Sequence, residues 1–211
     1  DQINRIQTLA ATIEPFIQSF VTTDSRNKAA MKALSEFEQA KLPMSQLLTR
    51  FTAWLGAISP KLDQIVKANS SARAHEFMLR ETAEQSKYLM SEAEEALAAE
   101  LSLSGGNAFS KLQGTITSQL SLDVELDGKM QKLPMPALIN LRSHPDPDTR
   151  CRGYEAENKA WEEVKETLAA CLNGVKGETN TLNKKRGRKD AIHSSLDAAR
   201  MDRKTLEAML A

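Results

Sequence analysis

Apolar side chains recur every three or four residues along most of this chain, which is the spacing of one face of an α-helix. The pattern is clear from the start of the chain and continues almost to its end; its first members are Ile3, Ile6, Leu9, Ile13 and Ile17. Only 9 of 211 residues are glycine and only 5% are aromatic, whereas strong helix formers are abundant. The sequence therefore predicts a mainly α fold, a multi-helix lobe.

Prolines and glycines predict where these helices end. Pro15 is expected to kink or divide the first helix, and the second helix is expected to stop before Pro43. A long helix is then expected from about residue 72 to 103. The run Ser104-Gly105-Gly106 should terminate it, because glycine tolerates the left-handed backbone conformation that closes helices.

One segment departs from the helical period. From Leu120 to Leu126, apolar and polar residues alternate, and Asp127-Gly128 follows before a second alternating run. Asp-Gly between such runs favours a two-residue hairpin turn, in which both central residues need positive φ. The sequence predicts one β-hairpin at about residues 119–133.

Bulk properties limit the organisation and the partners of the chain. We expect an N-terminal helical bundle over residues 1–103 and a second helical region with the hairpin over 104–211. The 28 basic residues balance the 28 acidic ones, so no net charge favours nucleic acid or an anionic membrane. No apolar run approaches the eighteen residues of a membrane span. Cys151 and Cys171 lie about 30 Å apart if one continuous helix carries both, and two unpaired thiols suit a reducing cytoplasm.

No catalytic site is evident in the sequence. A zinc peptidase helix needs two histidines four residues apart, with a glutamate after the first, and the run His75-Glu76-Phe77-Met78-Leu79 fails at its last position. His144 and His193 fall on separate elements. Both cysteines are expected on the apolar stripe of their helix, as inert buried thiols. We therefore expect no catalytic residue, no metal ligand and no cofactor in this chain.

Other polar and aromatic features have structural explanations. The basic run 183–189 is a solvated loop or a phosphate contact, and it has no interleaved aromatic residues for base stacking. Tyr154 and Trp161 are expected to anchor the core from one helix face. The acidic residues between Glu81 and Glu100 are expected to form a solvated face.

Several short motifs occur together in residues 137–211. They are the loop HPDPDTR, Arg152-Gly153-Tyr154-Glu155-Ala156, Trp161, Leu172–Gly177, Lys185-Arg186-Gly187 and Leu206–Leu210. In order and spacing they resemble the oligoendopeptidase F family of thimet-like zinc metallopeptidases, in the part that precedes the zinc site. The similarity is best from about residue 94 to 209. Because the chain starts with Asp1 and stops within an apparent helix, we expect a fragment without the catalytic HExxH segment.

The resemblance implies a noncatalytic N-terminal lobe. In this family a mostly helical body encloses a deep channel that admits short peptides for peptide-bond hydrolysis. The implied partners are an oligopeptide substrate and a C-terminal catalytic domain that carries zinc, with no nucleic acid and no membrane, in the cytoplasm. The resemblance also places Arg186 close to the peptide channel, with Lys176 and Asn173 as further possible substrate contacts.

Two hypotheses from other classes remain open. A stand-alone helical protein-interaction module without enzymatic activity should leave no apolar surface orphaned. A nucleic-acid binder that uses the basic loop should lose binding when residues 184–189 are neutralised. The peptidase hypothesis predicts instead a large exposed apolar or grooved face.

Overall fold

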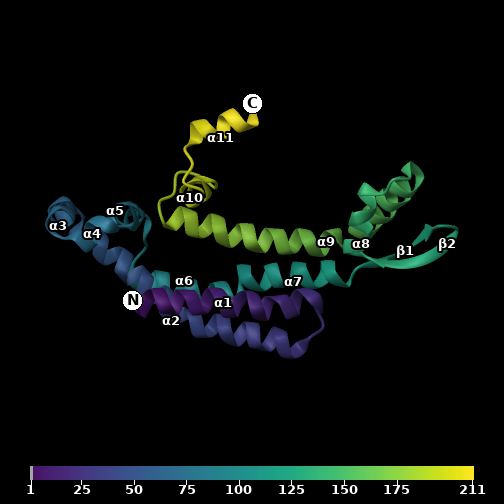
Figure 1. Cartoon of the computed structure of the whole chain (residues 1–211), viewed down its shortest axis with the longest axis horizontal. Helices are drawn as coiled ribbons and strands as arrows, with labels where there is room; N and C mark the ends of the chain where they lie inside the picture. Colours follow the sequence, from purple (N-terminus) through teal and green to yellow (C-terminus); the bar gives the residue numbers. More distant parts are fainter. Residues whose placement is uncertain (1) are drawn as a thin grey trace. The chain divides into compact units, whose positions relative to one another are not determined.

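The computed structural model describes residues 2–211, which form helices and one two-stranded antiparallel sheet (Figure 1). The α-helices are α1 (Gln2–Thr23), α2 (Lys28–Ile58), α3 (Leu62–Ala68), α4 (Ser70–Ala74), α5 (Glu76–Gln85), α6 (Glu92–Ser104), α7 (Gly106–Gln119), α8 (Met135–Asn140), α9 (Pro147–Lys185), α10 (His193–Ala198) and α11 (Arg203–Leu210). Short 3-10 helices are η1 (Ser59–Lys61), η2 (Ser86–Tyr88) and η3 (Leu141–Ser143), and the strands are β1 (Ser121–Leu126) and β2 (Lys129–Pro134). The predicted mainly α fold with one hairpin is confirmed.

The chain divides into two compact units, and neither is continuous in sequence. Unit 1 contains the chain up to residue 39 together with residues 105–175, and unit 2 contains residues 40–104 together with 176–211. Helices α2 and α9 therefore contribute to both units. The predicted division into residues 1–103 and 104–211 stays a prediction, although one unit boundary falls at the junction of α6 and α7.

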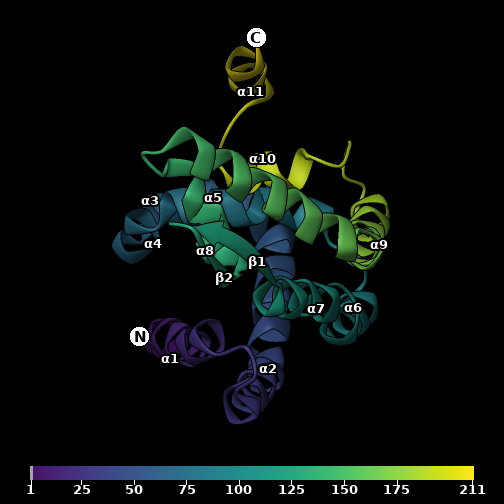
Figure 2. The same ribbon diagram turned by 90° about the vertical axis from the view of Figure 1, so that its right-hand side faces the viewer.

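The core of unit 1 lies between the hairpin, α8 and α9. Its buried residues are Val124, Met135, Leu138 and Ala160. Figure 2 shows the hairpin beside α8, and Trp161 of α9 packs against the same cluster. Alternate residues of β1 point into this core because successive side chains of a strand face opposite ways. The alternation read from the sequence thus positions the hairpin on the helices.

The hairpin turn has the predicted chemistry. Asp127 has φ of 51° and Gly128 has φ of 72°, as a two-residue primed turn requires. Leu126 pairs with Lys129 across the turn, which fixes the register of the whole ladder. The observed strands cover residues 121–134, against a prediction of about 119–133.

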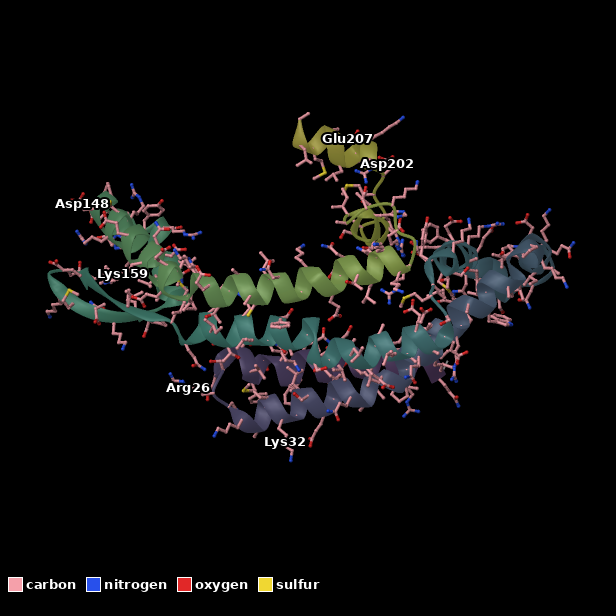
Figure 3. The ribbon with its side chains drawn as sticks, turned by 180° about the vertical axis from the view of Figure 1, so that it is seen from behind. Arg26, Lys32, Asp148, Lys159, Asp202 and Glu207 are labelled. Carbon is pink, nitrogen blue, oxygen red and sulfur yellow. The ribbon has the colours of Figure 1, made fainter. Side chains whose placement is uncertain are left out.

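The core of unit 2 is small. Leu62 and Val66 of α3 pack with Ala83 of α5, and Leu79 lies against them. At the C-terminal end, the Asp202 carboxylate accepts a hydrogen bond of 2.7 Å from the Thr205 amide and caps α11. Asp202 is labelled in Figure 3.

Neither proline ends its helix, although α2 was expected to stop before Pro43 and α1 to kink or divide at Pro15. Helix α1 continues through Pro15, and α2 continues through Pro43. A proline removes one backbone hydrogen bond and introduces a clash, at a cost of about 3 kcal/mol. Favourable helix on both sides propagates past that single loss, because each further residue adds its own bond.

The long helix expected over residues 72–103 was also wrong. Helices α4, α5 and α6 share this stretch, and the backbone is extended at Leu89. Ser91 and Glu94 form a reciprocal capping box at the start of α6, with backbone-to-side-chain distances of 3.1 and 3.3 Å. Helix α6 does end at Ser104, but Gly105 has φ of −94° and is not left-handed.

Candidate functional site around the Arg186 to Arg188 turn

The basic run is organised by the end of α9. Gly187 has φ of 68°, its amide donates to the Lys184 carbonyl at 3.2 Å, and the Arg188 amide donates to the Asn183 carbonyl at 2.9 Å. This pair of bonds is the Schellman arrangement that closes a helix at glycine. The turn leaves Arg186 and Arg188 facing protein carboxylates rather than extending as a flexible basic loop.

Arg186 forms a bidentate ion pair with Glu95 of α6. Its Nε donates to Oε1 at 2.9 Å and its Nη2 donates to Oε2 at 2.6 Å. The Glu95 side chain is only 7% exposed, and it also accepts the Met90 amide at 3.1 Å. Burial alone would raise the pKa of Glu95, but Arg186 and the Met90 amide together hold that pKa below its ordinary value. Glu95 is therefore a charged group inside unit 2.

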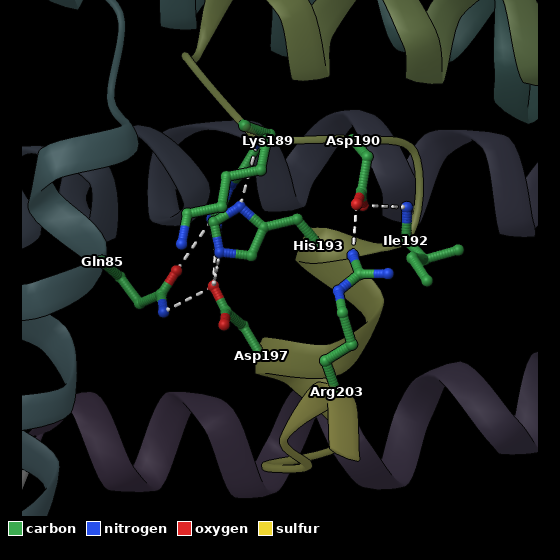
Figure 4. Close-up of polar contacts among 8 residues, drawn as sticks. Gln85, Lys189, Asp190, Ile192, His193, Asp197 and Arg203 are labelled. Carbon is green, nitrogen blue, oxygen red and sulfur yellow. Dashed lines mark hydrogen bonds and ion pairs between the residues drawn. The ribbon is translucent and has the colours of Figure 1, made fainter. Parts of the chain in front are cut away.

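Arg188 joins a second cluster, which is half-buried. Its guanidinium donates to Asp197 of α10 and, at 2.8 Å, to the side-chain oxygen of Gln85. The Gln85 amide in turn donates to Asp197 at 3.1 Å (Figure 4). Burial would raise the pKa of Asp197, whereas Gln85, Arg188 and nearby His193 lower it, and the net pKa is below the ordinary value. This cluster ties α10 to the end of α5.

Aromatic rings complete the cluster. The Arg188 guanidinium lies 4.0 Å from the centroid of the Tyr88 ring, within cation–π range. The His193 ring meets Tyr88 edge-on at 5.1 Å, and its Nδ1 accepts the Lys189 amide at 3.2 Å. His193 is thus a structural member of the cluster.

A second arginine near this cluster adopts an uncommon backbone conformation. Arg200 has φ of 51°, and its guanidinium pairs with both carboxylate oxygens of Glu81 at 2.9 and 3.0 Å. It also lies 5.0 Å from the Phe77 ring centroid. These contacts offset the cost of a left-handed residue that has a side chain.

A small pocket lies between α2 and α6, beside the Arg186–Glu95 pair. Its lining residues are Ser45, Gln46, Thr49, Arg50, Glu92, Glu95, Ala96 and Ala99, and its volume is about 50 Å³. Arg50 and Glu92 form an ion pair of 2.6 Å at its rim. A pocket of this size accommodates one or two water molecules rather than a peptide side chain.

The three residues predicted as substrate contacts differ in exposure and in their partners. Asn173 and Lys176 are exposed and lie one helical turn apart on α9. Arg186 is half-buried, and the guanidinium that would bind a substrate carboxylate binds Glu95. The role of these residues in substrate binding stays a prediction. Sequence inspection did not identify Glu95, since no local pattern links two residues that are 91 positions apart.

The described residues do not fit a zinc ion. No group of three or more His, Cys, Asp or Glu side chains that could hold a metal is found among residues 2–211. His75 lies between α4 and α5, whereas His144 accepts the Asp146 amide at 3.2 Å in unit 1. Within the same residues, no helix is both long and apolar enough to cross a membrane.

Two expectations for α9 were wrong. Cys171 is buried as expected, but Cys151 is exposed near the start of the helix, where its thiol lies 3.8 Å from the Glu155 carboxylate. Tyr154 is 63% exposed and does not anchor the core. Trp161 does pack against the core, and its indole N–H donates to Glu157 at 3.1 Å. The helix presents a narrower apolar stripe than its sequence suggested.

Two ion-paired carboxylates of this site, Glu95 and Asp197, predict an acid-sensitive structure. The folded-state pKa values of Glu95 and Asp197 lie below their ordinary values of 4.5 and 3.8, so their stabilisation is present above those values and is lost as pH falls through the folded-state pKa. We expect the free energy of unfolding, measured by urea titration at pH 3 to 7, to fall below about pH 4.5. Glu95→Gln should make that fall shallower. An equal slope in the variant and the parent would contradict this assignment.

Comparison with known proteins agrees with the sequence resemblance. Residues 59–121 match the family model of the N-terminal domain of M3 peptidases, described as Oligopeptidase F. No curated protein matches the sequence. The fold is similar to the crystal structure of oligoendopeptidase-F from Enterococcus faecium, with a TM-score of 0.79 and 15% identity over 92% of this chain and 39% of that chain. It is also similar to a "putative peptidase" from Chlamydophila abortus, with a TM-score of 0.60 and 14% identity over 92% of this chain and 34% of that one.

These matches confirm the resemblance to the N-terminal region of oligoendopeptidase F. The family match covers residues 59–121, farther toward the N-terminus than the motifs that first indicated it. The chain spans about two fifths of the solved oligoendopeptidase-F chain. At 14 to 15% identity, the structural likeness establishes the fold.

Proposed function

We propose that this chain is the noncatalytic N-terminal lobe of a zinc-dependent metallo-oligoendopeptidase, where it forms one wall of a channel for short peptides. The match of residues 59–121 to the Oligopeptidase F model carries the proposal. On this proposal the protein acts in the cytoplasm, and a separate catalytic domain supplies the zinc ion and its activated water. The lobe contributes by confining and orienting the peptide.

An exposed apolar face on α1 supports this proposal. No residue of α1 is buried, and six large apolar side chains of the helix are between 41% and 64% exposed; they are Ile3, Ile6, Leu9, Ile13, Phe16 and Phe20. Contiguous exposed apolar surface of this kind is typical of a protein interface. A covering catalytic domain accounts for it, whereas a self-sufficient helical module was expected to leave no such face.

The nucleic-acid hypothesis gains no support from the basic run. Arg186 and Arg188 are both engaged in ion pairs with carboxylates of unit 2. A guanidinium that binds a protein carboxylate would have to exchange that partner for a phosphate. The interaction-module hypothesis remains the second candidate, and the hydrolysis experiment below separates it from the peptidase lobe.

Peptide hydrolysis tests the proposal directly. A quenched fluorescent peptide would be incubated with this chain, and with the same chain extended through its native downstream sequence, with and without added zinc. We expect cleavage only by the extended protein, and we expect a chelator to stop it. Cleavage by neither protein would overturn the proposal and move the interaction module to first place.

A further inference from the structure

The two outer edges of the β-hairpin differ in how their backbone groups are satisfied. In an antiparallel pair, residues alternate between those bonded to the partner strand and those whose backbone groups point away from it. The tight turn makes Leu126 and Lys129 a bonded pair, and the bond of 3.0 Å from the Met135 amide to the Leu120 carbonyl fits the same alternation at the other end. Pairs 125–130 and 123–132 therefore direct their backbone groups outward.

The outer edge of β1 is partly covered by α9. The Arg152 guanidinium donates from Nε to the Glu125 carbonyl at 3.0 Å, and its Nη2 donates to Thr149 at 3.0 Å. Glu125 is one of the residues whose carbonyl the register directs outward. Its acceptor is thus already used within unit 1.

The outer edge of β2 has no such cover. Met130 and Lys132 direct their amides and carbonyls outward, and no hydrogen bond to these four groups is found within residues 2–211. Five of the six residues of β2 are exposed, and Met130 is 66% exposed. Pro134 has no amide, so the donors of this edge end at Lys132. The result is a short open edge of two donors and two acceptors.

We infer that the outer edge of β2 binds an extended oligopeptide as a third strand of the sheet. The unpaired groups of Met130 and Lys132 specify an extended backbone as the occupant, because only a neighbouring strand matches their alternation. An edge of this length engages the backbone of a peptide of a few residues. The choice of an oligopeptide as the ligand rests on the proposed function. The inference adds that the peptide binds at the outer edge of β2.

Side chains add a charge preference. Lys129 and Lys132 are the charged residues of β2, and they lie on opposite faces of the strand because they are three positions apart. On the face of Lys132, Asp123 stands directly opposite across the ladder. Lys129 lies on the opposite, core-facing side of the sheet, where its partner across the ladder is the uncharged Leu126. Its positive charge therefore has no directly opposed carboxylate. A carboxylate on that face of the bound peptide should strengthen binding.

A proline at residue 132 tests the edge without breaking the hairpin. The Lys132 amide points away from β1, so Lys132→Pro removes one outward donor and leaves the β1–β2 ladder intact. Lys132→Ala removes the same charge and keeps the amide. The probe is a fluorescein-labelled heptapeptide of alternating threonine and valine with one glutamate, titrated against the 211-residue chain by fluorescence polarisation. We expect Lys132→Pro to weaken binding about tenfold and Lys132→Ala less than threefold.

A second measurement does not depend on the variant folding. The same heptapeptide with an N-methyl group at every residue has no backbone donor on either edge, so it cannot complete the ladder, and it should bind the parent chain at least about tenfold more weakly. Equal binding of both peptides, or equal effects of Lys132→Pro and Lys132→Ala, would overturn the inference. Sedimentation of the chain without peptide provides a further check. A dimer that Lys132→Pro converts to a monomer would also overturn the inference, because the edge of β2 would then bind a second copy of this chain. If the edge binds peptide but the extended protein does not cleave, the proposed function fails and the peptide edge stands.

Discussion

Replacing Arg186 with alanine is expected to lower the free energy of unfolding by about 3 kcal/mol, because it leaves the Glu95 carboxylate buried and without its cation. Glu95 is 7% exposed and would retain only the Met90 amide as a hydrogen-bond donor. The small pocket beside Glu95 admits water, so the loss should lie at the lower end of the range for broken buried pairs. Urea unfolding followed by far-UV circular dichroism at pH 7 measures this loss.

The reciprocal variants show whether the loss comes from an unpaired charge. Glu95→Leu should cost only about 1 kcal/mol, since Arg186 is 31% exposed and its guanidinium can reach solvent. The double variant Arg186→Met, Glu95→Leu should unfold within about 1 kcal/mol of the parent, because no charge is then stranded. A double variant as unstable as Arg186→Ala would refute this account. It would indicate that residues 95 and 186 matter through shape rather than charge.

Gly174→Ala is expected to destabilise unit 1 by about 2 kcal/mol, although alanine is the better helix former. A Cβ at this position would lie 2.3 Å from Cδ2 and 2.7 Å from Cγ of Phe109 on α7. The whole Phe109 ring must move, because the added Cβ is too close to Cγ, the atom that joins the ring to its Cβ. Thermal and urea unfolding of the variant measure the effect, and Gly174→Ala combined with Phe109→Ala should recover part of the loss.

The same helix provides the matched control. Gly177 lies one turn beyond Gly174, and a Cβ there meets no atom within 4 Å. Gly177→Ala should therefore stabilise the protein by about 0.5 to 1 kcal/mol, through helix propensity and a less flexible unfolded chain. If both variants changed stability in the same direction, the close approach of α7 to α9 at Gly174 would not be the cause.

Features that depend on neighbouring residues could be predicted from the sequence. Asp127-Gly128 specified the hairpin because a two-residue turn is determined by the φ angles that its own residues tolerate. The cap of α11 by Asp202 is equally local. In both cases the interaction that fixes the structure spans at most three residues.

The division of residues 72–103 could also have been predicted. Ser91 and Glu94 have the serine-to-glutamate spacing of a capping box, which indicates that a helix begins after Ser91. The apolar periodicity on both sides concealed this signal. Pro43 misled in the opposite direction, because it was expected to stop a helix that its flanking residues sustain.

The partners of the basic turn could not be predicted. Arg186 binds Glu95 across 91 residues and Arg188 binds Gln85 across 103, so the fold must be known before either pair can be identified. The exposure of a single side chain also depends on residues distant in the sequence. Tyr154 lies on a helix that does enter the core at Ala160, yet no neighbouring element covers Tyr154 itself.

The interleaved arrangement of the two units has a consequence for synthesis on the ribosome. Unit 1 has all its segments once residue 175 has been made, whereas unit 2 still lacks residues 176–211. At about 5 to 20 residues per second, the nascent chain spends roughly 2 to 7 s in that state. For roughly the first 0.5 to 2 s of that interval, while residues 176–185 are made, Glu95 is present and Arg186 is not. The charge that unit 2 finally buries must therefore stay hydrated until translation delivers its partner.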